Sequence, residues 1–91
     1  MTGVRYQVLM KRRVLKDMHI LPMIVQRKLT LFLDDLRDVG PVLPHWPNYS
    51  RLGEGRYHCH LGYSWVACWT HEKGTVMIEV YYVGSRQSAP Y

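Results

Sequence analysis

Hydrophobic and polar residues alternate through the last third of the chain, from residue 57 to residue 83, and the apolar positions hold aromatic and β-branched side chains. Alternation with these residue types is typical of β-strands. A His-Glu-Lys-Gly sequence at residues 71–74 separates two of these segments and suits a turn. The pattern therefore predicts three antiparallel strands here, and a similar alternation at residues 4–9 predicts an opening strand.

Helical spacing replaces alternation in the first half of the chain. Apolar side chains three and four positions apart predict a short helix over residues 11–19: Val14, Leu15 and Met18. A longer apolar stripe predicts a second helix over residues 22–39: Val25, Leu29, Phe32 and Leu36. This helix should end at Gly40 and Pro41, because glycine accepts a left-handed cap and proline cannot continue a helix.

The segment that follows, residues 40–56, contains three prolines and three glycines and is expected to be a loop. Trp46 and Tyr49 should pin this loop to the core. We therefore expect an α+β fold, a single two-layer domain spanning residues 1–91. Its sheet would have about four mainly antiparallel strands, with the two N-terminal helices packed on one face. The other face would be open and available for binding.

Alternation also divides the C-terminal strands into two sets of side chains. The expected core set is apolar: Tyr57, Cys59, Leu61, Trp65, Ala67, Trp69, Val76, Ile78, Val80 and Tyr82. The opposite face should then present polar side chains beside Val66, Cys68 and Thr70: His58, His60, Glu79 and Tyr81, with Arg86 at the sheet edge. Cys59 and Cys68 would point to opposite faces, so we expect no disulfide.

Charge is distributed unevenly along the 91 residues. The formal net charge is +5, and residues 1–28 hold seven Lys or Arg against one acid. Such a surface favours a polyanionic partner, although an ordinary solvated helix face explains it equally well. No apolar run approaches the ~18 residues needed to cross a bilayer, and the N-terminal residues lack a signal-peptide pattern. We therefore expect a cytoplasmic protein without membrane contact.

The order of elements, the aromatic strands and the Val-Gly-Ser-Arg sequence at residues 83–86, followed by Tyr91, resemble the RelE/ParE superfamily of bacterial and archaeal toxins. The resemblance also includes Arg-Val-Leu-Lys-Asp from residue 13 and Arg-Leu at residues 51–52. It implies the toxin of a type II toxin-antitoxin pair. In the RelE branch, a ribose 2′-hydroxyl attacks the adjacent phosphodiester of ribosome-bound messenger RNA without a metal, so no cofactor is expected.

The resemblance implies roles for particular residues. His58 and His60 replace two basic residues of ribosome-dependent RelE proteins and could transfer protons, because free imidazole has a pKa near ~6.5. Arg86 would brace the scissile phosphate, and Tyr91 would act as an auxiliary base or stack on a nucleotide. Further side chains are expected to bind RNA: Lys11, Arg12, Arg13, Lys16, Arg56 and Tyr81. One family arginine of the middle strand is replaced by Val66.

Three functions remain open at this stage. The first is a messenger-RNA endoribonuclease that represses translation. The second, favoured by Val66, is a non-enzymatic protein, either a ParE-like gyrase inhibitor or an inactive relative that binds an antitoxin. The third is a metal site formed by His58, His60 and Glu79, although the family chemistry needs no metal. The implied partners are a cognate antitoxin, messenger RNA and the ribosome, and operator DNA bound through the antitoxin.

Overall fold

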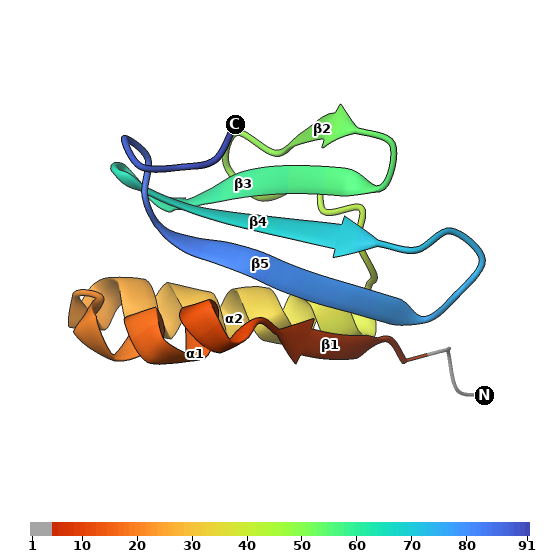
Figure 1. Cartoon of the computed structure of the whole chain (residues 1–91), viewed down its shortest axis with the longest axis horizontal. Helices are drawn as coiled ribbons and strands as arrows, with labels where there is room; N and C mark the ends of the chain where they lie inside the picture. Colours follow the sequence, from red (N-terminus) through yellow and green to blue (C-terminus); the bar gives the residue numbers. More distant parts are fainter. Residues whose placement is uncertain (1–4) are drawn as a thin grey trace.

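The computed structural model describes residues 5–91 as an α+β fold with one five-stranded sheet (Figure 1). The elements follow in the order β1 (Gln7–Met10), α1 (Arg12–Asp17), the 3-10 turn η1 (Met18–Ile20), α2 (Met23–Asp38), β2 (Ser50–Gly53), β3 (Arg56–Gly62), β4 (Trp65–His71) and β5 (Met77–Ser85). The strand order is β1-β5-β4-β3-β2. Only β1 and β5 run parallel, so the predicted fold class, including a mainly antiparallel sheet, is confirmed.

Three boundaries differ from the sequence prediction. The opening strand covers residues 7–10 rather than 4–9, and Val4 lies outside the described residues. The first helix is shorter than expected and continues as η1. The predicted loop contains β2, because Ser50 and Arg51 pair with β3 before a register shift interrupts the ladder. A four-residue strand whose pairing is interrupted in this way is too short to produce an alternating pattern in the sequence.

Helix α2 supplies the main apolar face of the helical layer. Its buried side chains follow the predicted stripe, with Leu33 added: Val25, Leu29, Phe32, Leu33 and Leu36. The helix ends at Asp38, and Gly40 follows the Val39 cap with a left-handed φ of 111° and an N–H that donates to the Leu36 carbonyl at 3.1 Å. A side chain at this position would also meet the Tyr6 ring, 2.8 Å from an ideal Cβ. No helix within residues 5–91 is long and apolar enough to cross a membrane.

Aromatic side chains join α2 to the sheet. The Phe32 ring makes edge contacts with Trp46 and Trp69, at centroid distances of 5.6 and 5.0 Å. Trp69 is fully buried, and its indole N–H donates to the Pro41 carbonyl at 3.0 Å. Trp46 and Tyr49 pack against the same core, which confirms their predicted role in fixing the loop.

A β-bulge changes the faces predicted for β5. Cys68 pairs with Tyr82, but the next residue of β4 pairs with Val80, so Tyr81 is the extra residue. An extra residue reverses the alternation beyond it. Tyr82, expected in the core, therefore packs on the opposite face, and Val83 takes the core position. Val76 was also expected in the core, but it precedes β5 and is exposed.

The two cysteines lie on opposite faces of the sheet, as predicted. Cys59 belongs to the core beneath α2, whereas Cys68 packs with Val66 and Tyr82 on the other side. Both are buried free thiols.

The loop anchor at Asp35 can be tested by mutation. Its carboxylate Oδ2 accepts hydrogen bonds from Trp46 Nε1 at 2.7 Å and from His45 Nε2 at 3.0 Å. Asp35→Ala should lower the free energy of unfolding in urea by about 2 kcal/mol. Asp34→Ala, which removes only an exposed pair with Arg37, should cost less than ~0.5 kcal/mol. Equal losses for the two variants would contradict the anchoring role.

Candidate active site

The sheet face away from α2 is organised in rows, because directly paired residues on neighbouring strands share a face. Three rows cross β3, β4 and β5 in turn: Arg56, Thr70 and Glu79; then His58, Cys68 and Tyr82; then His60, Val66 and Gly84. Both predicted histidines therefore lie on this face, in adjacent rows. Their ring centroids are 6.0 Å apart.

The face was expected to be open, but it is covered at the histidines. His58 and His60 are each only 9% exposed. The Ser50 hydroxyl lies 3.0 Å from His58 Nδ1, and the Asn48 amide nitrogen lies 3.3 Å from His60 Nδ1. The loop is held in place by the His60 N–H, which donates to the Pro47 carbonyl at 2.8 Å. Alternation in the sequence predicts which face of the sheet a side chain occupies, but it does not predict which loop will cover that side chain.

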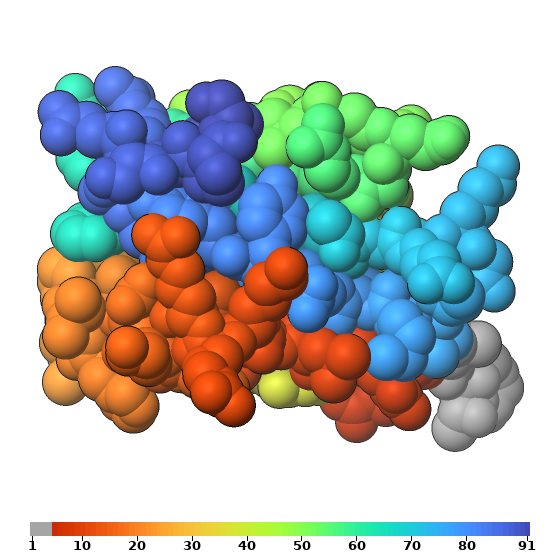
Figure 2. Space-filling model, viewed as in Figure 1, coloured from red at the N-terminus to blue at the C-terminus, as the bar shows by residue number. Residues whose placement is uncertain are grey.

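The C-terminal tail, residues 86–91, folds back across the same face and forms a second cover (Figure 2). The Arg86 N–H donates to the Ser64 carbonyl at 2.8 Å, which fixes the start of the tail. Ala89 packs on the apolar cluster around Cys68. The Tyr91 ring then reaches His58, with 4.5 Å between the ring centroids. The tail thus brings its terminal phenol to a histidine on β3.

Burial sets the protonation states of these groups. It lowers the pKa of His58, and the neighbouring His60 lowers it further. Burial also lowers the pKa of His60, with a further contribution from the positive charge of Arg86. The pKa of Tyr91 is raised, mainly by burial. At neutral pH the site therefore presents two neutral imidazoles and a neutral phenol close to one guanidinium.

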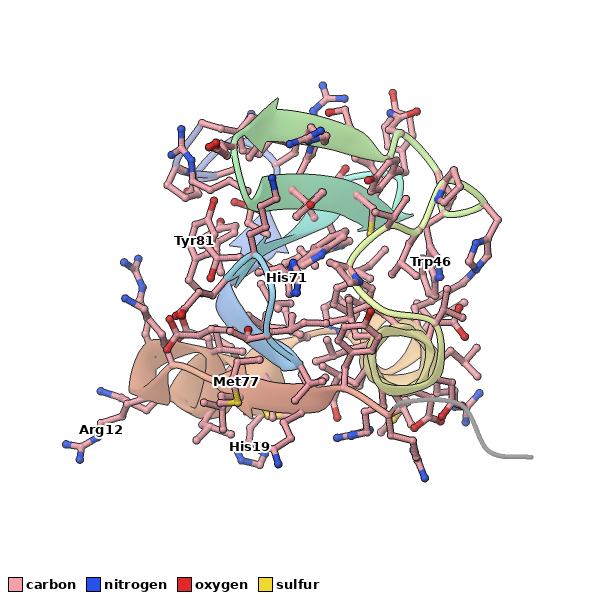
Figure 3. All side chains as sticks on the ribbon, turned by 90° about the vertical axis from the view of Figure 1, so that its right-hand side faces the viewer. Arg12, His19, Trp46, His71, Met77 and Tyr81 are labelled. Atoms are coloured by element: carbon pink, nitrogen blue, oxygen red, sulfur yellow. The ribbon has the colours of Figure 1, made fainter. Side chains whose placement is uncertain are left out.

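The other predicted RNA-binding residues divide into two groups. Lys11, Arg56 and Tyr81 line one hollow of about 200 Å³ together with Thr70 and Glu79. The remaining three are exposed on α1, where Arg13 pairs with Asp17 at 3.8 Å: Arg12, Arg13 and Lys16. In Figure 3, Arg12 and Tyr81 point to the same side of the molecule, away from Trp46.

No family model matches the sequence, and no curated protein matches it significantly. Solved structures do match. RelE of the archaeal RelE-RelB complex from Pyrococcus horikoshii superposes with a TM-score of 0.75 at 20% identity, over 93% of this chain and 99% of that one. The isolated E. coli RelE toxin superposes with a TM-score of 0.71 at 19% identity, over 93% of this chain and 88% of that one. A chain of the E. coli DinJ-YafQ toxin-antitoxin complex superposes with a TM-score of 0.74 at 14% identity, over 97% of this chain and 100% of that one.

The chain has the RelE-like fold. The resemblance inferred from the sequence is therefore confirmed at the level of the fold, because these matches cover 90% or more of the chain with TM-scores above 0.7. The identities of 14 to 20% leave the chemistry to be argued from the side chains on the face described above.

Two residues of this RelE-like face were missed by the sequence reasoning. Asn48 and Ser50 contact the histidines but belong to the predicted loop. The Pro-Asn pair at residues 47–48 indicates a turn, and Asn48 adopts a left-handed φ of 54° that asparagine tolerates. That signal places a turn in the sequence without showing which strand it will contact.

Two other candidate chemistries find little support on this face. Within residues 5–91, no group of three or more His, Cys, Asp or Glu side chains lies close enough to hold a metal ion. Glu79 is paired across the sheet with Thr70, in a row without a histidine, so it does not join His58 and His60 in one group of ligands. Burial raises the pKa of the Cys68 thiol to about 11, so it is not a thiolate nucleophile at neutral pH.

The buried histidines should make folding stability depend on pH. Their folded-state pKa values lie below the usual 6.5, so the unfolded chain binds more protons in that range. The free energy of unfolding should therefore fall as the pH drops below 6.5. In urea titrations, a His58→Gln/His60→Gln variant should lose part of this dependence, whereas His19→Gln, at an exposed position, should keep it. If the free energy of unfolding depended on pH equally in the wild-type chain, the double variant and His19→Gln, burial of the two histidines would not be the cause.

Proposed function

We propose that this chain is the toxin of a type II toxin-antitoxin pair and that it represses translation by cleaving ribosome-associated messenger RNA. The convergence of four side chains carries the proposal. His58, His60 and Tyr91 come together beside the charge of Arg86, although they belong to β3 and to the C-terminal tail. A base, a proton donor and a phosphate-binding cation are the groups that attack by a 2′-hydroxyl requires.

His58 acts as the general base in this proposal. A neutral imidazole is the form that accepts a proton, and the lowered pKa keeps His58 in this form at neutral pH. When Nδ1–H donates to the Ser50 hydroxyl, 3.0 Å away, Nε2 carries the free lone pair. This nitrogen takes the proton of the 2′-hydroxyl as the oxygen attacks phosphorus. His60 lies in the next row, and in this proposal it is the second imidazole that can accept the proton.

Arg86 and Tyr91 act on the phosphate and the leaving group. The exposed guanidinium of Arg86 offers paired N–H donors to the non-bridging oxygens, whose charge rises in the transition state. The raised pKa of Tyr91 favours the protonated phenol over the auxiliary base expected from the resemblance. Tyr91 therefore donates a proton to the leaving 5′-oxygen or stacks on a base.

Substrate access requires the tail to move. The Tyr91 ring lies on His58, and both histidines are nearly buried. Beyond the bond from the Arg86 N–H to the Ser64 carbonyl, the described hydrogen bonds of the tail are short-range: Ala89 N–H to the Arg86 carbonyl at 3.3 Å and Ser88 N–H to the Ser85 hydroxyl at 3.2 Å. A nucleotide that displaces the Tyr91 ring from His58 exchanges one stacking contact for another.

An antitoxin is the partner that we propose for the helical side of the molecule. The α1 segment exposes basic side chains, and apolar side chains are exposed beside them: Leu15, Ile20, Met23 and Ile24. An acidic amphipathic segment would complement both features. Operator DNA would be bound through this antitoxin in the toxin-antitoxin complex.

A non-enzymatic function is the second candidate, and one observation favours it. Val66, at the position of the family arginine, is fully buried and packs with Cys68 and Tyr82. Val66 therefore contributes apolar packing at a position where the family has a positively charged arginine. A gyrase inhibitor would damage DNA and leave transcripts intact, whereas the proposed toxin produces codon-positioned cuts in messenger RNA. Primer extension on induced cells separates the two outcomes.

Arg86 is the most direct site for a mutational test in cells. Induction of the wild-type chain should arrest bacterial growth, and Arg86→Ala should relieve the arrest. The loss of one transition-state contact should reduce cleavage, measured by primer extension, by about 10²-fold to 10³-fold. Arg27→Ala removes the same charge from an exposed position of α2 and should leave the arrest unchanged. Undiminished arrest in both Arg86→Ala and the double alanine variant of His58 and His60 would contradict the residue assignment.

A further inference from the structure

Glu79 is the one acidic side chain in the three rows described above, whose other members are basic or neutral. It lies in the row of Arg56 and Thr70 and lines the hollow described above with Lys11 and Tyr81. Within residues 5–91, no Lys, Arg or His nitrogen forms an ion pair with its carboxylate at 4.0 Å or less. The carboxylate is half-buried and free to accept hydrogen bonds from a ligand.

The hollow adjoins the proposed cleavage site. Its row is two residues along β3 from the row of His58, a separation of about 7 Å from the rise of a strand. Successive nucleotides of an extended single strand are spaced similarly. Unlike the histidines, Arg56 and Lys11 are exposed and Tyr81 is half-buried, so this end of the face is accessible. This spacing allows a nucleotide next to the scissile phosphate to reach the hollow.

The size and lining of the hollow suit one nucleobase. Its volume of about 200 Å³ lies below the ~300 Å³ at which pockets for drug-sized ligands begin. Tyr81 offers an aromatic ring on which a base can stack, while Arg56 and Lys11 can hold the flanking phosphates. A carboxylate in this position repels phosphate, so its favourable partner is a group with N–H donors.

We infer that Glu79 binds the Watson-Crick edge of a guanine next to the cleaved bond. Guanine presents two adjacent donors on this edge, N1–H and the N2 amino group, which match the two oxygens of a carboxylate. Adenine, cytosine and uracil each have only one N–H donor group on this edge, so each can form only one such hydrogen bond with a carboxylate. The inference rests on the proposed function for the identity of the ligand as RNA, and it adds the base that the site selects.

A binding measurement tests the inference without relying on cleavage. The probes are fluorescently labelled 2′-O-methyl hexanucleotides, which lack the attacking hydroxyl: hexaadenylate and the same sequence with one central guanine. At about 50 mM salt, fluorescence anisotropy should show roughly tenfold tighter binding of the guanine probe by the full chain. Glu79→Gln should reduce the ratio of the affinities for the guanine and adenine probes to near one, because an amide offers only one acceptor oxygen. Glu54→Gln, an exposed acid-to-amide control at the β2–β3 turn, should keep the tenfold ratio.

A probe with inosine in place of guanine repeats the test without any mutation. Inosine lacks the N2 amino group, so the wild-type chain should bind it about fivefold more weakly than guanine. Equal affinity for guanine, inosine and adenine probes would overturn the inference, as would a guanine preference that survives in Glu79→Gln. Failure to bind any of the probes at millimolar concentration would overturn it as well.

Mapping of transcript ends in induced cells separates this inference from the proposed function. Wild-type cuts should be enriched beside guanine, and the ratio of guanine-adjacent to adenine-adjacent cuts should fall about tenfold in Glu79→Gln. Cuts without guanine enrichment would refute the base-binding role and leave the nuclease proposal standing. Guanine-selective binding without any cutting would refute the nuclease and leave the base-binding site standing.

Discussion

Burial of Trp69 fixes the orientation of the whole sheet. Its ring is fully buried against Phe32, and its indole N–H is satisfied by the Pro41 carbonyl. Because side chains of a strand alternate strictly, a slip of one residue would turn Trp69 outward and move every neighbour to the wrong face. With Trp69 inward, Cys68 and Val66 must face away from α2. Cross-strand pairing then places His58 and His60 beside them.

The same burial that orders the face also determines its chemistry. Neutral imidazoles are suited to accept a proton, but they supply no charge, so in the proposed mechanism Arg86 alone must stabilise the charge that develops on the phosphate. Val66 increases that demand, since an apolar side chain occupies the position of a family cation. The proposed site, with two histidines and one exposed arginine, therefore differs from the sites rich in lysine and arginine that the resemblance implies.

Local periodicity explains which features were predictable from the sequence. Helix α2 and strands β3 to β5 each carry a pattern long enough to define both the element and its faces, and Trp65, Ala67 and Trp69 lie on the predicted side. Strand β2 has too few paired residues for such a pattern. The β-bulge at Tyr81 depends on how two strands pair, so the predicted faces of β5 were wrong beyond that residue.

The candidate site was predictable in part for the same reason. The positions of His58 and His60 follow from alternation within one strand. Their covering by Asn48, Ser50 and Tyr91 depends on contacts between segments distant in the sequence, and so do their lowered pKa values. Glu79 was assigned to the correct face, but the role inferred for it depends on its neighbours in the fold, which alternation does not reveal.

The chemistry of the cleaved ends tests the central claim most directly. Attack by a 2′-hydroxyl forms a bond from that oxygen to phosphorus and breaks the bond to the 5′-oxygen, leaving a 2′,3′-cyclic phosphate and a 5′-hydroxyl. Purified protein added to ribosomes stalled on a defined messenger RNA should produce a downstream fragment that a kinase labels without prior phosphatase treatment. A 2′-deoxynucleotide before the cut should abolish cleavage. A fragment with a 5′-phosphate, or equal cleavage of the deoxy-substituted message, would contradict the account.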